Sequence, residues 1–184
     1  HLYQMRAEWF AQWGGLEYQS KGDRNKLMLA LEDYQTSLSH AQSVSTMDRV
    51  TVGSSFGNLA SYCDKLLDLN CFPKNEIGKI SKLVIESYVK GIIYGDSFCR
   101  SKLLRLLRLA GEYPEMFPYL EENLLSVPAW IYLKYSAQLM SCLDRAEGVV
   151  VVKILEYVAT KYSEALYFPF TSTIECLGSS GKSL

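Results

Sequence analysis

One pentapeptide in the chain matches a motif that positions a nucleophile. Residues 53–57 fit G-x-S-x-G, in which a serine stands on a sharp strand-to-helix turn and is activated by a histidine further along the chain. Ser55 would be that serine, but His40 lies before it and no histidine follows it. Because the general base is missing, residues 53–57 are better interpreted as a glycine-rich loop before a helix, with Ser55 as a helix cap.

The C-terminal residues resemble a phosphate-binding loop, with Gly181, Lys182 and Ser183 in the order that the motif requires. That loop also needs a glycine five positions before Gly181, where Cys176 stands, and it needs a strand before it and a helix after it. These requirements are not met. We therefore predict that the C-terminal residues form a flexible tail without phosphate chemistry.

No other catalytic or metal site is indicated. The H-R-D, D-F-G and V-A-I-K motifs of protein kinases do not occur. The cysteines show no C-x-x-C pair, so four converging zinc ligands are not indicated, and His40 is interpreted as a polar surface residue. We predict no catalytic, cofactor-binding or metal-binding residue in this segment, and reduced, buried thiols at all five cysteines: Cys63, Cys71, Cys99, Cys142 and Cys176.

Four basic residues recur among leucines and form a candidate basic patch: Arg100, Lys102, Arg105 and Arg108. Steps of three residues would place the last three on one side of a single helix. The patch could bind nucleic acid or an acidic partner, or it could be a solvated helix edge whose long side chains cover apolar surface. The net charge of −1 argues against a dedicated nucleic-acid-binding domain.

Composition indicates a globular protein. The 184 residues are 48% hydrophobic and 21% charged, which is enough apolar side chain for a buried core. No apolar run reaches the length of about 18 residues that crosses a bilayer, and no secretory signal is visible, so no membrane partner is expected. The reduced thiols predicted above are typical of an intracellular protein. The first residue is histidine, which indicates a segment of a longer chain.

The hydrophobic spacing is helical almost throughout, and Leu2, Met5, Trp9, Trp13 and Leu16 share one helix face. Residues 3–20 and 24–39 are predicted helices joined by a turn at residues 21–23, which makes residues 1–45 an αα-hairpin similar to a tetratricopeptide unit. We interpret the tryptophans, Trp130 included, as core anchors; a docking patch for another domain is the alternative.

The rest of the chain is divided by composition. Residues 46–55 are rich in serine and threonine and are predicted to be a loop. Residues 56–170 are predicted to form helical repeats, and residues 171–184 a short helix and a flexible tail. About eight helices of typical length fit the chain. The predicted fold is all-α, an α-solenoid of antiparallel helix pairs. Its helices after residue 55 are expected at 56–69, 77–94, 98–110, 115–125, 130–143 and 144–166.

Three stretches resemble a known family. They are Ser-Val-Pro-Ala-Trp at 126–130, Gln-Leu-Met-Ser-Cys-Leu-Asp at 138–144, and Tyr-Ser-Glu-Ala-Leu-Tyr-Phe-Pro-Phe at 162–170. Together with residues 59–64 they resemble the end of the FAT region of the phosphatidylinositol-3-kinase-related protein kinases. The likeness runs from about Phe56 to Phe170, and it is nearest to the DNA-dependent protein kinase branch of that family.

This resemblance implies a helical scaffold that supports and regulates an adjoining kinase domain. The parent would be a nuclear serine/threonine kinase that uses ATP and magnesium and acts in double-strand-break repair by non-homologous end joining. Its partners would be the kinase domain and neighbouring helical repeats of the same chain, and DNA-end-binding proteins and DNA through the parent. The alternatives are a segment of the target-of-rapamycin type and a free-standing helical adaptor that binds peptides in a groove.

A scaffold of this kind acts through packing, and eight residues of the resembling region are predicted to be its packing residues: Trp130, Leu133, Leu139, Leu143, Leu155, Val158, Tyr162 and Phe168. If Trp130 is buried, its replacement by alanine is expected to cost about 3–5 kcal/mol of folding free energy.

Overall fold

The computed structural model describes the backbone of residues 2–44 and 48–180, and the side chains of these residues except Ala110 and 176–180. Every regular element in the described residues is a helix. The chain divides into two compact units, His1–Leu103 and Leu104–Leu184. This division falls inside the span 56–170 that the sequence predicts as one run of repeats.

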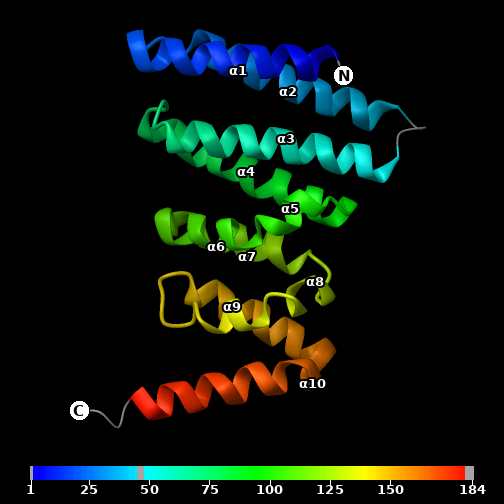
Figure 1. The fold of residues 1–184 in the computed structure, drawn as a ribbon, viewed down its shortest axis with the longest axis vertical. Coiled ribbons are helices and arrows are strands. Elements are labelled where there is room, and N and C mark those ends of the chain that lie inside the picture. The colour runs from blue at the N-terminus through cyan, green and yellow to red at the C-terminus, as the bar shows by residue number, and fades with distance from the viewer. Residues whose placement is uncertain (1, 45–47, 181–184) are drawn as a thin grey trace. The chain divides into compact units, whose positions relative to one another are not determined.

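Unit 1 contains two antiparallel helix pairs and a short fifth helix (Figure 1). Helix α2 packs between α1 and α3, and α3 packs against both α4 and α5. The predicted all-α fold of α-solenoid type is confirmed, most clearly in these stacked pairs. The helices are α1 (Leu2–Lys21), α2 (Asn25–Ser43), α3 (Arg49–Asp68), α4 (Lys74–Tyr94) and α5 (Ser97–Ser101).

Helix α1 ends within one residue of its predicted end, and α4 ends at Tyr94 as predicted. Gly22 has φ +70° in the turn between α1 and α2, and Gly95 has φ +97° at the end of α4. Glycine adopts this left-handed conformation without the steric cost that a Cβ adds. The Asp96 carboxylate then accepts a hydrogen bond of 2.7 Å from the Cys99 amide and caps α5.

The loop predicted at 46–55 is wrong over its described residues. Helix α2 continues to Ser43, and α3 begins at Arg49, where Asp48 caps it by accepting a bond of 2.6 Å from the Thr51 amide. Residues 45–47 lie outside the described part. The helix tolerates its serines and threonines because burial of Val52 and Phe56 outweighs weak local propensity.

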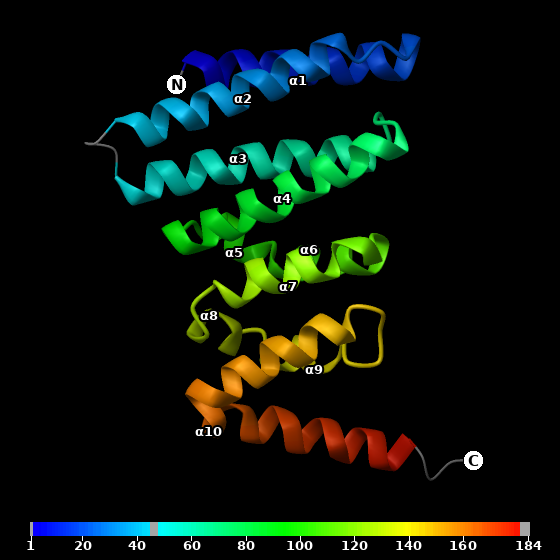
Figure 2. The ribbon, with the colours of Figure 1, turned by 180° about the vertical axis from the view of Figure 1, so that it is seen from behind.

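Unit 2 is built around a long bent helix, α10 (Gly148–Ser180), which packs on three shorter ones (Figure 2). The bend is at Tyr162, whose φ and ψ of −144° and 52° are not helical. We call residues 148–161 and 163–180 the two arms of α10. The other elements are α6 (Leu103–Glu112), a 3-10 turn (Pro114–Met116), α7 (Phe117–Leu125), α8 (Trp130–Leu133) and α9 (Ser136–Met140).

Three predicted boundaries in unit 2 are wrong. The helix expected at 130–143 is two short helices, and residues 144–147 are turns rather than the start of the last helix. Residues 171–180 continue α10 instead of forming a separate short helix, and residues 181–184 lie outside the described part. The described residues thus hold ten α-helices, more than the eight expected, because short turns break two of the predicted helices.

Candidate binding surfaces

The G-x-S-x-G pentapeptide lies inside α3 and serves close packing. Ser55 donates a hydrogen bond to the Thr51 carbonyl, and Ser54 donates one of 3.1 Å to the Asp96 carboxylate. A Cβ on Gly53 would stand 3.2 Å from the Cβ atoms of both Tyr94 and Asp96. The interpretation as a loop with a serine cap is therefore wrong, since the glycine lets α3 approach the α4–α5 junction.

The described cysteines are packed inside the protein. Cys63, Cys71, Cys99 and Cys142 are free and buried, as predicted, whereas the side chain of Cys176 lies outside the described part. Burial raises the pKa of the Cys63 thiol to about 12. Burial also raises the pKa of Cys99, and its hydrogen bond with Asp96 raises it further. Within the described residues, no three histidine, cysteine or acidic side chains gather as metal ligands would.

The predicted basic stripe does not form on one helix. The helix expected at 98–110 is interrupted at Lys102, which separates Arg100 in α5 from Arg105 and Arg108 in α6. In unit 1 the Lys102 ammonium lies 5.1 Å from the centre of the Phe98 ring. In unit 2 the Arg105 guanidinium pairs with the Glu112 carboxylate at 2.8 Å. Part of the basic charge is thus already engaged inside each unit.

The predicted packing residues divide into three groups. Leu139 and Val158 are buried, and Leu133, Leu143 and Leu155 are half-buried. The remaining three, Trp130, Tyr162 and Phe168, are 51%, 40% and 77% exposed, so their predicted burial is wrong.

The cause lies in the two elements that carry these exposed side chains. Helix α8 is a single turn that directs Ile131 and Tyr132 inward instead of Trp130. In the second arm of α10, Leu166 is the one buried side chain among residues 163–175. The cost of 3–5 kcal/mol expected for Trp130→Ala consequently no longer applies, because it assumed burial.

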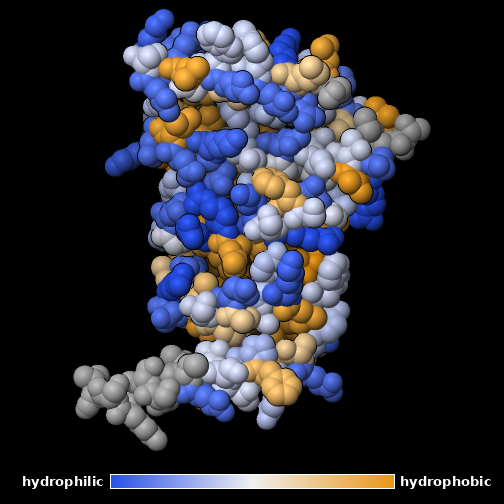
Figure 3. Space-filling view, viewed as in Figure 1, coloured by the Kyte–Doolittle hydropathy of each residue, from blue (hydrophilic) through white to orange (hydrophobic). Residues whose placement is uncertain are grey.

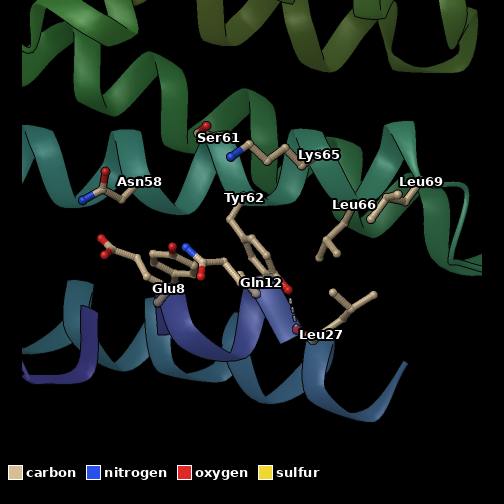
Figure 4. Close-up of a pocket in the computed structure, with 11 residues that line it drawn as sticks. Glu8, Gln12, Leu27, Asn58, Ser61, Tyr62, Lys65, Leu66 and Leu69 are labelled. Atoms are coloured by element: carbon tan, nitrogen blue, oxygen red, sulfur yellow. Dashed lines mark hydrogen bonds between the residues drawn. The ribbon is translucent and has the colours of Figure 1, made fainter. Parts of the chain in front are cut away.

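A cleft of about 460 Å³ opens in unit 1 between α1, α2 and α3 (Figure 4). We call it the unit 1 cleft. Glu8 and Gln12 extend from α1 toward α3, from which Tyr62 extends back toward α2. The polar side chains that line the cleft are Glu8, Gln12, Asn58, Ser61 and Lys65, over a floor that includes Leu27, Tyr34, Tyr62 and Leu66.

The floor of the unit 1 cleft is a fixed aromatic pair. The rings of Tyr34 and Tyr62 lie 5.0 Å apart, and the Tyr62 hydroxyl donates a bond of 2.8 Å to the Leu27 carbonyl. Burial raises the pKa of Tyr34 to about 12, and the nearby charge of Glu8 is a smaller cause. Burial likewise raises the pKa of Tyr62, so both hydroxyls stay neutral. Sequence reasoning missed this cleft because its walls come from three separate helices.

Helix α1 carries an uncovered apolar face. We call it the α1 stripe, and its members are 50–78% exposed: Leu2, Met5, Trp9, Trp13 and Leu16. The Trp9 and Trp13 rings lie 6.0 Å apart along this face. Ala7 and Gly14 are buried; around a helix of 3.6 residues per turn, Ala7 lies about 200° from Trp9, and Gly14 lies about 100° from Trp13.

The α1 stripe changes the interpretation of its tryptophans. Figure 3 shows apolar patches among mainly hydrophilic atoms where α1 reaches the surface of unit 1. The prediction that Trp9 and Trp13 are core anchors is wrong, and the alternative of a docking patch is favoured. The spacing predicted the shared face correctly, but it could not show whether another helix covers that face.

Unit 2 has an apolar groove of about 460 Å³ between the two arms of α10 and the end of α9. Val152 and Leu155 of the first arm face Leu166 and Phe170 of the second across it, and Met140 closes one side. Phe170 is 52% exposed and the neighbouring Tyr167 is 63% exposed. We call this the α10 groove; the described residues that line it are mainly apolar, with Glu156 and Ser163 among them.

Comparison with known proteins gives a consistent likeness. No protein-family model matches the chain. It is 27% identical over 147 residues to the DNA-dependent protein kinase catalytic subunit of Gallus gallus, and 26% identical over 118 residues to that of Xenopus laevis; these matches cover 72% and 61% of this chain. The subunit of Dictyostelium discoideum is 23% identical over 148 residues, which cover 75% of this chain.

The matched region is a small part of each relative. It spans about 3% of the length of these three catalytic subunits. None of the helices in the described residues is long and apolar enough to cross a membrane. The sequence similarity, together with the all-helical fold, relates this chain to a segment of the DNA-dependent protein kinase catalytic subunit.

Proposed function

We propose that this chain is a FAT-type helical scaffold segment of a serine/threonine kinase similar to the DNA-dependent protein kinase catalytic subunit. It would support and regulate an adjoining kinase domain of the same parent chain, which would use ATP and magnesium. The setting would be nuclear repair of DNA double-strand breaks by non-homologous end joining. Contacts with DNA and with DNA-end-binding proteins would be made through the parent rather than by this segment.

The observation that carries the proposal is the α1 stripe. Five large apolar side chains on one helix face, each at least half exposed, are unusual for a protein that works alone. Stacked helical repeats bury such faces against the neighbouring repeat. The chain matches about 3% of the length of its relatives, so a parent of similar size would supply many neighbouring helices. The α10 groove offers a second surface of the same kind.

The direct test is to sequence the transcript on both sides of this segment. A reading frame that continues beyond Leu184 into a kinase domain, with motifs similar to H-R-D and D-F-G, is expected. A stop codon soon after Leu184 would contradict the scaffold proposal and favour the free-standing adaptor. A target-of-rapamycin parent would be recognised in the same experiment by the kinase domain that follows, although the relatives described above favour the other branch.

If the reading frame continues into a kinase domain, the kinase activity of the full-length parent can be measured with variants of this segment. Trp9→Lys with Trp13→Lys is expected to lower the kinase activity of the parent by loosening the packing around α1. Gln19→Lys with Gln35→Lys adds the same charge at exposed positions of α1 and α2 outside the stripe and is the matched control. Equal activity of the two double variants would argue against a supporting role for this face.

The adaptor remains a second candidate because of the unit 1 cleft. A free-standing helical-repeat adaptor needs a groove with polar groups that can hold a peptide, and the unit 1 cleft has such groups. The two candidates are separated by the reading frame, whereas the cleft itself is compatible with both.

A further inference from the structure

The unit 1 cleft concentrates hydrogen-bonding groups that the protein does not use. Among the described residues, none bonds to the side chains of Gln12, Asn58, Ser61 and Lys65 or to the Tyr34 hydroxyl, which all line the cleft. The other floor tyrosine is satisfied internally, since its hydroxyl donates to the Leu27 carbonyl. A cleft in which polar groups converge over an apolar floor is the usual form of a ligand site.

We propose that the unit 1 cleft binds a short extended peptide that carries an acidic side chain. Gln12 of α1 and Asn58 of α3 each present an amide, which can donate to a peptide carbonyl and accept from a peptide N–H. An extended chain offers both groups at regular intervals, because its backbone makes no hydrogen bonds of its own. The amides on the two walls therefore match a peptide main chain better than they match a ligand with acceptors only.

The charges in the cleft set the chemistry and direction of the peptide. Among the described residues that line the cleft, Lys65 is the one cation and Glu8 the one anion, and they come from different helices. Within the described part of the chain, the Glu8 carboxylate accepts one side-chain hydrogen bond, of 3.2 Å from Gln4 one turn earlier. The acidic side chain of the peptide lies at Lys65 with Ser61 as a second donor, and a basic group or main-chain N–H lies at Glu8.

The floor supplies the apolar contact. The packed rings of Tyr34 and Tyr62, with Leu27 and Leu66, form a rigid surface that accepts one aliphatic side chain between the two charged ends. A single-stranded nucleic acid fits less well, because such sites follow the phosphates with several cations, whereas this cleft has one cation and one carboxylate. The inference does not depend on the proposed function, since the cleft lies entirely within this chain.

The test is a binding screen on the 184-residue chain with a positional library of fluorescein-labelled hexapeptides, read by fluorescence anisotropy. Selection of aspartate or glutamate at one position, with an aliphatic residue nearby, is expected. Lys65→Glu should then weaken the selected peptide by about tenfold, since it replaces attraction with repulsion. Lys79→Glu makes the same charge change on exposed surface of α4 outside the cleft and should leave the affinity unchanged.

A second variant tests whether the charge of Lys65 affects peptide affinity only by long-range attraction. Ser61→Arg fills the cleft while adding positive charge, so it should abolish binding if the peptide lies inside and strengthen it if attraction is only long-range. Helix content by circular dichroism checks that each variant folds. Absence of an acidic preference, equal loss in Lys79→Glu, or tighter binding of a single-stranded DNA oligomer than of any peptide would overturn the proposal.

Discussion

Among single residues, the buried tyrosines and cysteines make folding stability depend on alkaline pH. Burial raises the folded-state pKa of Cys63 and of Tyr34 to about 12, above ordinary values of about 8.5 and about 10. An unfolded chain therefore loses these protons at lower pH than the folded chain. The stabilising contribution is complete below the ordinary pKa and is lost as pH rises toward the folded-state value.

We predict that the free energy of unfolding falls progressively between about pH 8.5 and about pH 12. Urea denaturation at several pH values in this window measures the slope. Cys63→Ala removes one of the titrating groups, so its stability should fall less steeply in the lower half of the window than that of the wild type. Parallel curves for the two proteins would show that the Cys63 thiol does not titrate as its burial requires.

The hydroxyl of Tyr132 ties α8 to α7 inside unit 2. Tyr132 is fully buried, and its hydroxyl donates a bond of 2.6 Å to the Leu124 carbonyl. We expect Tyr132→Phe to cost about 0.5–1.5 kcal/mol, as for one buried hydrogen bond, because the carbonyl still accepts from the Val127 amide. Tyr167→Phe, at a position 63% exposed, is the control. It should change the free energy of unfolding, measured by chemical denaturation, by less than the experimental error.

At the scale of elements, two adjacent glycines of α1 have opposite roles. A Cβ on Gly14 would stand 2.9 Å from the Leu27 backbone nitrogen in α2, while a Cβ on Gly15 would meet nothing within 4 Å. Gly14 thus allows α1 and α2 to approach closely, and Gly15 only weakens the helix. Their substitution by alanine separates packing from intrinsic helix propensity at neighbouring positions.

We predict that Gly14→Ala destabilises the protein by about 1–3 kcal/mol, because the backbone of α2 must move. Gly15→Ala should stabilise it by about 0.5–1 kcal/mol, since alanine is the better helix former in an open position. Thermal unfolding followed by circular dichroism measures both. Similar midpoints for the two variants would mean that α1 and α2 are not in the close contact described here.

For the whole molecule, the uncovered α1 stripe and a net charge of −1 favour association between copies. Little net charge gives weak mutual repulsion, and the calculated isoelectric point is about 6.2. We predict that the isolated chain self-associates at high concentration near pH 6 to 7. Trp9→Lys with Trp13→Lys should remove most of this association without loss of helix content, as sedimentation velocity would show.

The control for that experiment is again Gln19→Lys with Gln35→Lys, which changes the net charge equally and leaves the stripe intact. If both double variants dissociate to the same extent, net charge explains the association and the stripe does not. If neither does, the α10 groove becomes the surface to test, and Phe170→Lys at its exposed edge is the corresponding substitution.

Elements whose ends are set by neighbouring residues were predicted correctly, and elements that depend on distant contacts were not. The αα-hairpin with its turn near residues 21–23 and the end of α4 at Tyr94 were predicted, because turn and cap chemistry acts within a few residues. The start of α3 at Arg49 was missed, since serines and threonines disfavour helix locally while Val52 and Phe56 are buried by distant partners. The interruption at Lys102, which breaks the basic stripe, likewise has no glycine or proline beside it to mark a helix end.

The sequence by itself thus determined the all-helical class, the order of most helices and the relation to a kinase segment, because helical spacing and residue identity are carried by the chain itself. Only the tertiary structure decided which apolar faces are covered. Trp9, Trp13, Trp130 and Phe168 have the spacing of core residues, yet they are at least half exposed. Burial depends on what lies opposite a face, and the unit 1 cleft exists only where three helices meet, so neither can be read from one helix alone.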